Sequence, residues 1–415
     1  MRVGASLNHI RWITFAFEIS RQNRFGGAMQ NRGRSIGLFC AEPFRLFFPV
    51  GIMLGMAGVL LWPLFYLGAG IEYPSVAHAR LMIEGFMASF IFGFLGTAGP
   101  RITSTRPFTL PETAAIFTLD LLAAGLHVGG AHRVGDICFF GCLLFFVRTI
   151  GVRFYERKDC PPPNFALVAL GLFSGIGGAA LLAYAEATQY SRAYQFGSAL
   201  LNQCFVLLPI LGVAPFFLGR LLDLPRPDLP ESRVFPPGWF AQAAVAATIG
   251  VVIAGSFLLE VFGFGEIGAW TRAATVAIYV AAKMPFRGRS FLADCLRAGI
   301  IWTAIGFTVV AFYPGYRVGG LHVVFVTGFA LVAFTVAIRV VFGHSGRTDL
   351  LQKPLPFFVA TIGLLLLAMI SRFTADLAPG TRTLHLLSAA ICWLVAAFIW
   401  MEKVIPKVAT ADPEE

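Results

Sequence analysis

The chain alternates long apolar runs with short polar ones. A membrane-spanning helix needs about 20 mostly apolar residues. Twelve runs approach or exceed that length: 45–68, 79–99, 111–131, 134–154, 164–186, 193–222, 237–261, 265–283, 290–313, 320–342, 355–371 and 381–402. The 193–222 run is long enough to tilt, or to break at Pro209 or Pro215. The pattern predicts an all-α, polytopic integral membrane bundle of about twelve helices.

Composition supports a chain that lies in the lipid bilayer. Of the 415 residues, 57% are hydrophobic and only 13% are charged, and the mean hydropathy is +0.75. Soluble domains are about 25% charged. The net charge of +10 is attributed to loops at the membrane surface, and no nucleic-acid partner is inferred. Seven cysteines include no C-x-x-C pair, so neither a zinc ribbon nor a redox pair is indicated, and we interpret them as small buried hydrophobic residues.

The distribution of Lys and Arg predicts the orientation. The segment up to Arg45 carries seven arginines, and the even-numbered loops carry 13 Lys and Arg, whereas the odd-numbered loops carry 5. Cytoplasmic loops are enriched in Lys and Arg, so both termini are predicted to be cytoplasmic.

Five segments follow from this pattern. Residues 1–44 form a basic cytoplasmic segment in which 10–20 is either an amphipathic surface helix or part of a loosely ordered tail. A Pro-rich cytoplasmic loop, 224–236, divides the bundle into two six-helix halves, 45–223 and 237–403, and a tail follows at 404–415. A faint internal similarity joins HARLMIEGF at 78–86 and HVVFVTGF at 322–329.

Ionisable residues inside the predicted spans are costly unless they are paired. Arg80 and Glu84 lie four residues apart on one helix face, and Asp294 and Arg297 lie three apart, so each pair can neutralise itself. Other charged residues in the spans have no such neighbour: Asp120, Arg148, Arg272 and Arg339. Each of these groups is interpreted either as part of an interhelical salt bridge or as a charged head that extends to the membrane interface. For the Arg80–Glu84 pair, a polar, partly hydrated cavity facing the bundle interior stays open as well.

Histidines gather at the predicted outer ends of the spans. His78 and His322 each begin a helix that runs from outside to inside, so they are natural companions in an outer-face site. Met82 follows His78 by four residues and is a candidate soft ligand for copper or haem iron. His344 lies at the other end of the same span as His322, about 33 Å away at 1.5 Å per residue. The remaining outer histidines are interpreted as ordinary interfacial residues: His127, His132 and His385.

Three stretches resemble the NnrS family of polytopic haem- and copper-containing membrane proteins. HARLM followed by GFMASFIFGFLGTAGPR (78–82 and 85–101) is similar to that family's HAHEM and Gly-Phe-rich helix. LHVVFVTGFALVAFTVAIRVVFGHSGR (321–347) resembles a helix that opens with His and closes in R-x-x-x-G-H-T-G-R, and EPFRLFFPVG (42–51) resembles an FRPFF-like start.

The resemblance implies a haem cofactor, copper as a second one, and a role in nitric oxide metabolism or resistance to nitrosative stress in a bacterial-type inner membrane. It implies cofactor binding by His78, Arg80, His322 and Arg339, and metal binding by His78, Met82, His322 and His344. Nitric oxide is the implied diatomic ligand. The sequence identifies no electron donor, since flavin, nicotinamide and C-x-x-C-H motifs are missing, and no enzymatic activity is assigned.

Departures from the family pattern weaken the expectation of copper. Arg80 stands where HAHEM has its second His, Leu81 replaces its Glu, and Arg297 stands where the family tends to show a His. A guanidinium cannot deprotonate to bind a metal. Arg80 is therefore expected to hold a haem propionate or another anion. Two other functions stay open: a transporter of a small solute or ion, and a membrane scaffold.

Overall fold

The computed structural model describes residues 37–222, 233–288 and 290–410, and within these ranges the regular structure is entirely helical. The helix considered at 10–20 lies outside the described residues, as do most of the segment 1–44, the first part of the Pro-rich loop and the last residues of the tail.

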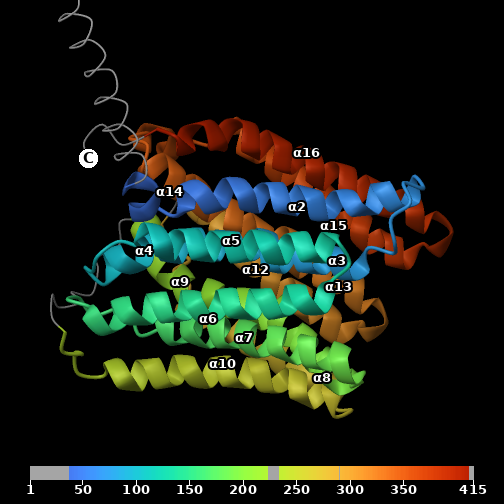
Figure 1. Cartoon of the computed structure of the whole chain (residues 1–415), viewed down its shortest axis with the longest axis horizontal. Helices are drawn as coiled ribbons and strands as arrows, with labels where there is room; N and C mark the ends of the chain where they lie inside the picture. Colours follow the sequence, from blue (N-terminus) through green and yellow to red (C-terminus); the bar gives the residue numbers. More distant parts are fainter. Residues whose placement is uncertain (1–36, 223–232, 289, 411–415) are drawn as a thin grey trace, which may run out of the picture.

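The described residues form twelve helical rods, which run back and forth through the molecule (Figure 1). The first six are α2 (Phe44–Tyr66), α3–η1–α4 (Ser75–Arg80, Leu81–Met87, Ala88–Ile102), α5 (Leu110–Val128), α6 (His132–Glu156), α7 (Phe165–Thr188) and α8–η2–α9 (Ser191–Ala199, Leu200–Cys204, Phe205–Leu221). The other six are α10 (Trp239–Val261), α11 (Gly265–Lys283), α12 (Phe291–Phe312), η3–α13–η4–α14 (Pro314–Tyr316, Arg317–His322, Val323–Ala330, Leu331–Gly343), α15 (Pro356–Leu377) and η6–α16 (Pro379–Thr381, Arg382–Val408). A 3-10 turn, η5 (Thr348–Gln352), precedes α15.

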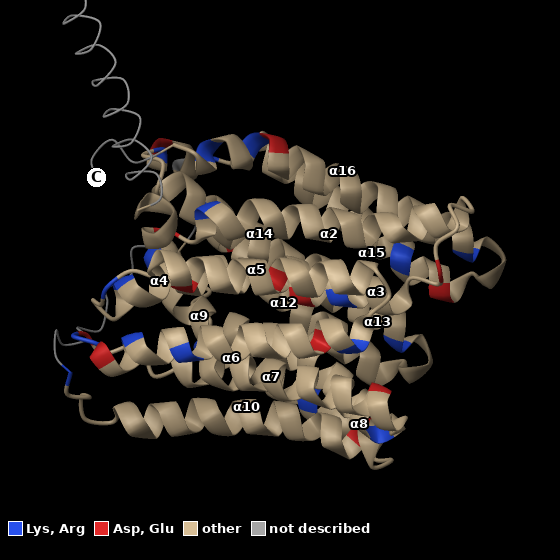
Figure 2. Cartoon of the chain, viewed as in Figure 1, with Lys and Arg blue, Asp and Glu red and all other residues tan. Residues whose placement is uncertain are grey.

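Ten of these rods in the described residues are long and apolar enough to cross a membrane. The other two, α5 and α11, are 19 residues long and carry charged residues within their bounds. The predicted all-helical membrane bundle is thus confirmed, with about twelve helices. We call the end of the bundle at which α2 begins and α16 ends the inner end, and the opposite end the outer end. Charged residues gather toward both ends, with a few in the interior (Figure 2).

Two predicted spans differ from the structure in detail. The span predicted at 355–371 is too short, because α15 continues to Leu377 and its last turns carry an ion pair between Arg372 and Asp376 at 3.0 Å. The run at 193–222 does not break at a proline: α9 continues through Pro209 and Pro215, and the irregular turn is the π-helical η2 upstream.

Three rods occupy the centre of the bundle. The rods Ser75–Ile102, Ser191–Leu221 and Pro314–Gly343 are 78%, 67% and 67% buried over their apolar windows, against 28–56% for the other seven candidate spans. Each central rod contains a π-helical segment toward its outer end: η1, η2 and η4. Such segments are rare and are frequently found at functional sites.

The packing repeats every four helices. Each central rod packs against the helix before it (α2, α7 and α12), and the next two helices form an antiparallel pair (α5 with α6, α10 with α11, α15 with α16). The last helix of each set packs on the first helix of another set, and α16 closes the ring on α2. The similar sequences at 78–86 and 322–329 fall at equivalent places in the first and third sets. The division into two six-helix halves stays a prediction.

In all three sets, a glycine on the first helix lies against the π-helical segment of the central rod. A Cβ on Gly58 would lie 2.9 Å from Leu81 Cβ, one on Gly178 would lie 2.7 Å from the Leu201 backbone nitrogen, and one on Gly306 would lie 2.8 Å from the Val324 backbone nitrogen. Each of these glycines therefore lets its helix approach the π-helical segment of the neighbouring central rod more closely than any other residue would permit.

Candidate functional site

His78 lies near the outer end of the first central rod, on α3. Its Nδ1 is 3.0 Å from the carbonyl oxygen of Gly58 on α2, and its ring meets the edge of Trp62 at a centroid distance of 6.0 Å. The side chain is half-buried. Because a carbonyl oxygen only accepts, Nδ1 carries the proton in this arrangement, and Nε2 is the nitrogen with the lone pair.

His322 ends α13 at the outer end of the third central rod and has the same kind of anchor. Its Nδ1 is 2.7 Å from the carbonyl oxygen of Val318, and its ring lies 6.0 Å from that of Phe325. Nε2 again carries the lone pair. In metal sites, a ligating histidine typically donates its other ring N–H to a carbonyl or carboxylate, which fixes the ring. Both imidazoles are held in this way.

The two imidazoles lie within range of electrostatic interaction with each other, and both interact with Arg372 on α15. Met82 belongs to the same region, because its sulfur is 3.4 Å from where a Cβ on Gly58 would stand. The structure thus gathers His78, His322 and Met82 at the outer end.

Arg80 does not face this region as a free cation. Its Nε is 2.6 Å from Asp136 Oδ1 and 3.1 Å from Glu84 Oε1, and its Nη2 is 3.2 Å from Asp136 Oδ2. The predicted pairing of Arg80 with Glu84 is present. Since two buried carboxylates already engage this guanidinium, the expected contact with a haem propionate does not fit its surroundings.

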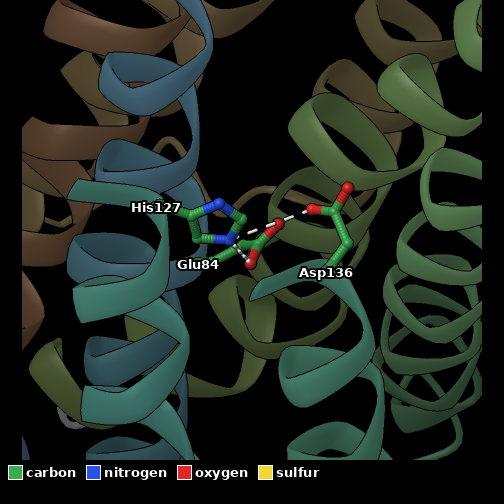
Figure 3. A group of neighbouring side chains, drawn as sticks. All are labelled: Glu84, His127 and Asp136. Atoms are coloured by element: carbon green, nitrogen blue, oxygen red, sulfur yellow. Dashed lines mark hydrogen bonds and ion pairs between the residues drawn. The ribbon is translucent and has the colours of Figure 1, made fainter. Parts of the chain in front are cut away.

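Glu84, His127 and Asp136 form a buried cluster (Figure 3), and its two carboxylates also engage Arg80. His127 Nε2 is 2.9 Å from Glu84 Oε2 and 3.9 Å from Asp136 Oδ1. Gly135 makes room for the imidazole, because a Cβ there would lie 2.5 Å from a carbon of the His127 ring. One atom from each of the three side chains lies within 4.8 Å of the others, which is close enough for a metal ion. A cation would compete with Arg80, so we interpret the cluster as an ion-pair network.

Sequence reasoning missed most of this cluster. His127 was interpreted as an interfacial residue and Asp136 was not singled out, yet both side chains are at most 1% exposed. The short turn between α5 and α6 brings the end of one helix beside the start of the next, so residues 127 and 136 face a common neighbour. A polar residue on each side of such a short turn is the sequence signal that could have predicted this pairing.

His344 and Arg339 lie at the inner end, far from the outer histidines. His344 Nδ1 bonds to Glu42, and its Nε2 is 3.2 Å from a guanidinium nitrogen of Arg101. Both ring nitrogens are therefore engaged, which leaves neither one available for the predicted metal binding in this arrangement. Arg339 lines a cavity at this same end.

Glu42 organises the inner end. Its carboxylate pairs with Arg45 at 2.6 Å and with Arg101 at 2.7 Å, and it accepts a hydrogen bond from His344. Arg45 also donates to the carbonyl oxygens of Val408 and Thr410, so the start of α2 is tied to the end of α16. This network closes the ring of helices between the first and last rods.

The predicted pairing of Asp294 with Arg297 is also present, at 2.8 Å. Arg297 in addition donates to the carbonyl oxygens of Pro285, Arg287 and Gly288, in the loop between α11 and α12. At this position a guanidinium therefore holds a loop in place.

Acidification is expected to weaken the network around Glu42. Burial raises the pKa of Glu42, but the hydrogen bond from His344 and the positive charges of His344 and Arg45 outweigh it, so the net shift is downward from the usual value of 4.5. A lowered carboxylate pKa contributes stability that is present above the ordinary pKa and is lost as pH falls through the folded-state value. The thermal midpoint of Glu42→Gln in detergent should lie below that of the native chain at pH 7, and the gap should narrow as the pH falls below the usual carboxylate value of 4.5. A gap that is constant with pH would contradict this assignment.

A family model described as NnrS protein matches residues 38–411, nearly the whole chain. No curated protein matches the chain. Since the matched region includes every helical rod and all of the histidines described above, the chain belongs to the NnrS family.

Proposed function

We propose that this membrane protein binds a haem at its outer end through His78 and His322, and that it acts in nitric oxide metabolism or in resistance to nitrosative stress. The proposal takes the outer end as the non-cytoplasmic side of a bacterial-type inner membrane, with both termini in the cytoplasm. The observation that carries it is the pair of imidazoles near each other, each with Nδ1 on a backbone carbonyl and a lone pair on Nε2.

Each residue at the outer end has a definite task in this proposal. The carbonyl oxygens of Gly58 and Val318 fix the two rings and keep the Nε2 lone pairs available for iron. Met82 is a candidate thioether ligand beside His78. Haem, when bound, would supply an iron that can take a diatomic ligand such as nitric oxide.

A haem also carries two propionates, which require a cationic partner. Arg80 is enclosed by Glu84 and Asp136, whereas Arg372 interacts with both imidazoles and is paired with Asp376 near the end of α15. We therefore assign the propionate contact to Arg372 in place of Arg80. Copper is the weaker cofactor proposal, because Arg80 and Arg297 stand where imidazoles would add ligands.

The test is the visible spectrum of the protein purified in a non-ionic detergent after expression with ample haem. The native chain should show a Soret band that shifts when nitric oxide is added. His78→Ala and His322→Ala should each lower the haem-to-protein ratio at least about tenfold, since each imidazole is proposed to hold the haem through Nε2.

His385→Ala is the matched control. His385 is also a half-buried histidine near the outer end, but its Nδ1 lies 3.3 Å from the hydroxyl of Ser371 and it is not among the proposed ligands. It should keep the full haem content. A colourless native protein, or a Soret band that survives both substitutions, would rule out haem binding at this site.

A small-solute transporter is the second candidate, and one observation favours it. An apolar cavity lies between the three central rods, lined by residues that include Phe90, Val213 and Val332. Deeply buried cavities between bundle helices are common ligand sites. A preparation without haem whose thermal midpoint rises with an added apolar solute would favour this candidate.

A further inference from the structure

A second cavity opens at the inner end, where the three central rods come together. We call it the inner vestibule. Each rod contributes one arginine to its wall: Arg101 from α4, Arg220 from α9 and Arg339 from α14. His344, one residue beyond α14, and Thr97 complete its polar lining. The four-helix periodicity of the fold thus places one guanidinium from each set around a single cavity.

Neighbouring contacts hold these guanidiniums in place. Arg101 is fixed from one side by Glu42 and from the other by His344. Arg220 lies over the ring of Phe216, with its Cζ 4.7 Å from the ring centroid. Arg339 folds back over Gly343, since one of its terminal nitrogens is 2.5 Å from where a Cβ on that glycine would stand.

The vestibule is strongly basic. Among the described residues its lining includes three arginines and a histidine but neither aspartate nor glutamate. Glu42 lies at its edge and is shared among Arg45, Arg101 and His344. A concave site lined by one sign of charge concentrates ions of the opposite sign. Guanidiniums match the planar or tetrahedral oxygens of carboxylates and phosphates.

Two aromatic rings bound the vestibule toward the membrane centre. Phe94 and Phe217 meet edge to face at 5.9 Å, and both line the inner vestibule as well as the apolar cavity beyond it. Beyond these two rings the lining is apolar, so a charged group is favoured in the vestibule and not past the rings. An apolar chain attached to that group could occupy the apolar cavity.

We propose that the inner vestibule binds an oxyanion group, a phosphate or a carboxylate, carried either by a free ion or by the head group of an amphiphile. Arg101, Arg220 and Arg339 donate to its oxygens, and His344 helps to hold Arg101 in place. The site is independent of the outer histidines, since His322 and His344 lie at opposite ends of one rod, about 30 Å apart.

The experiment measures thermal midpoints and calorimetric binding of the full-length protein in non-ionic detergent. The probes are inorganic phosphate and octanoate, each at constant ionic strength balanced with chloride. At least one probe should stabilise the native chain saturably. Saturation by phosphate identifies a free ion, whereas saturation by octanoate alone identifies an amphiphile. Arg220→Gln and Arg339→Gln should each weaken that binding about tenfold, which is about 1.4 kcal/mol.

Arg106→Gln is the matched control, because Arg106 is a half-exposed arginine at the same end that does not line the vestibule. It should leave the affinity unchanged. Arg220→Lys and Arg339→Lys keep the charge and should retain part of the affinity, so they replace the glutamine variants where those fail to fold. The proposal is overturned when neither probe stabilises the native chain beyond chloride, or when Arg106→Gln weakens binding as much as the vestibule variants do.

Discussion

Replacing Arg80 with glutamine is expected to lower the free energy of unfolding by about 3–5 kcal/mol, the usual cost of removing one partner from a buried ion pair. Arg80 is 3% exposed, and Glu84 and Asp136 are 2% and 1% exposed. Without the guanidinium, two carboxylates stay buried beside His127. Reversible unfolding in mixed detergents, followed by near-ultraviolet circular dichroism, measures the loss.

Glu84→Gln is the informative comparison for that variant. It removes one of the two carboxylates and leaves Arg80 bonded to Asp136 through two nitrogens, at 2.6 and 3.2 Å. The remaining pair is balanced, so the expected loss is about 1 kcal/mol, that of one hydrogen bond. Equal losses in Arg80→Gln and Glu84→Gln would show that the balance of charge is not what stabilises the cluster.

The substitution Glu260→Gln should destabilise the protein by a similar amount, about 3–5 kcal/mol. Glu260 lies in the last turn of α10 and is 2.5 Å from Arg272 on α11. The side chain of Arg272 is only 1% exposed and lies over the ring of Phe257 at 4.1 Å. The same carboxylate reaches Arg317 at the start of α13. Its neutralisation leaves a buried guanidinium without a counter-charge and loosens the contact between the second and third helix sets. The measurement is the same detergent unfolding.

Arg317→Gln distinguishes the contributions of the two ion pairs of Glu260, one with Arg272 and one with Arg317. Arg317 is 43% exposed, and exposed ion pairs contribute about 0–1 kcal/mol. The variant should therefore unfold close to the native midpoint. A loss as large as that of Glu260→Gln would mean that the contact with α13, and not the buried Arg272, accounts for the effect.

Much of the fold could be predicted from the sequence, because apolar length and loop charge are local properties. The runs around 45–68 and 237–261 match α2 and α10 within a few residues. The end of α15 was misplaced because Arg372 and Asp376 neutralise each other inside the helix. The four-helix periodicity could not be predicted, since it depends on which helices touch.

In the candidate sites, too, the contacts within one helix could be predicted from the sequence, whereas the contacts between helices could not. Arg80 with Glu84 and Asp294 with Arg297 were predictable from helical spacing, because both partners stand on one helix. The partners of Arg272 and of His127 come from neighbouring helices, which a single sequence does not position. The placement of His78 and His322 at one end followed from counting spans. The anchoring of each ring on a carbonyl oxygen required coordinates.

The π-helical segments in the three central rods carry a consequence for insertions and deletions. Each residue advances an α-helix by about 100°, so a single deletion within Leu81–Met87 would turn the remainder of that rod by about a quarter of a revolution. Arg101, which lies downstream on the same rod, would then swing from the inner vestibule toward a neighbouring helix or lipid. The rotational phase of each central rod is thus set by the extra residue in its wide turn, and length changes there should be far more disruptive than substitutions.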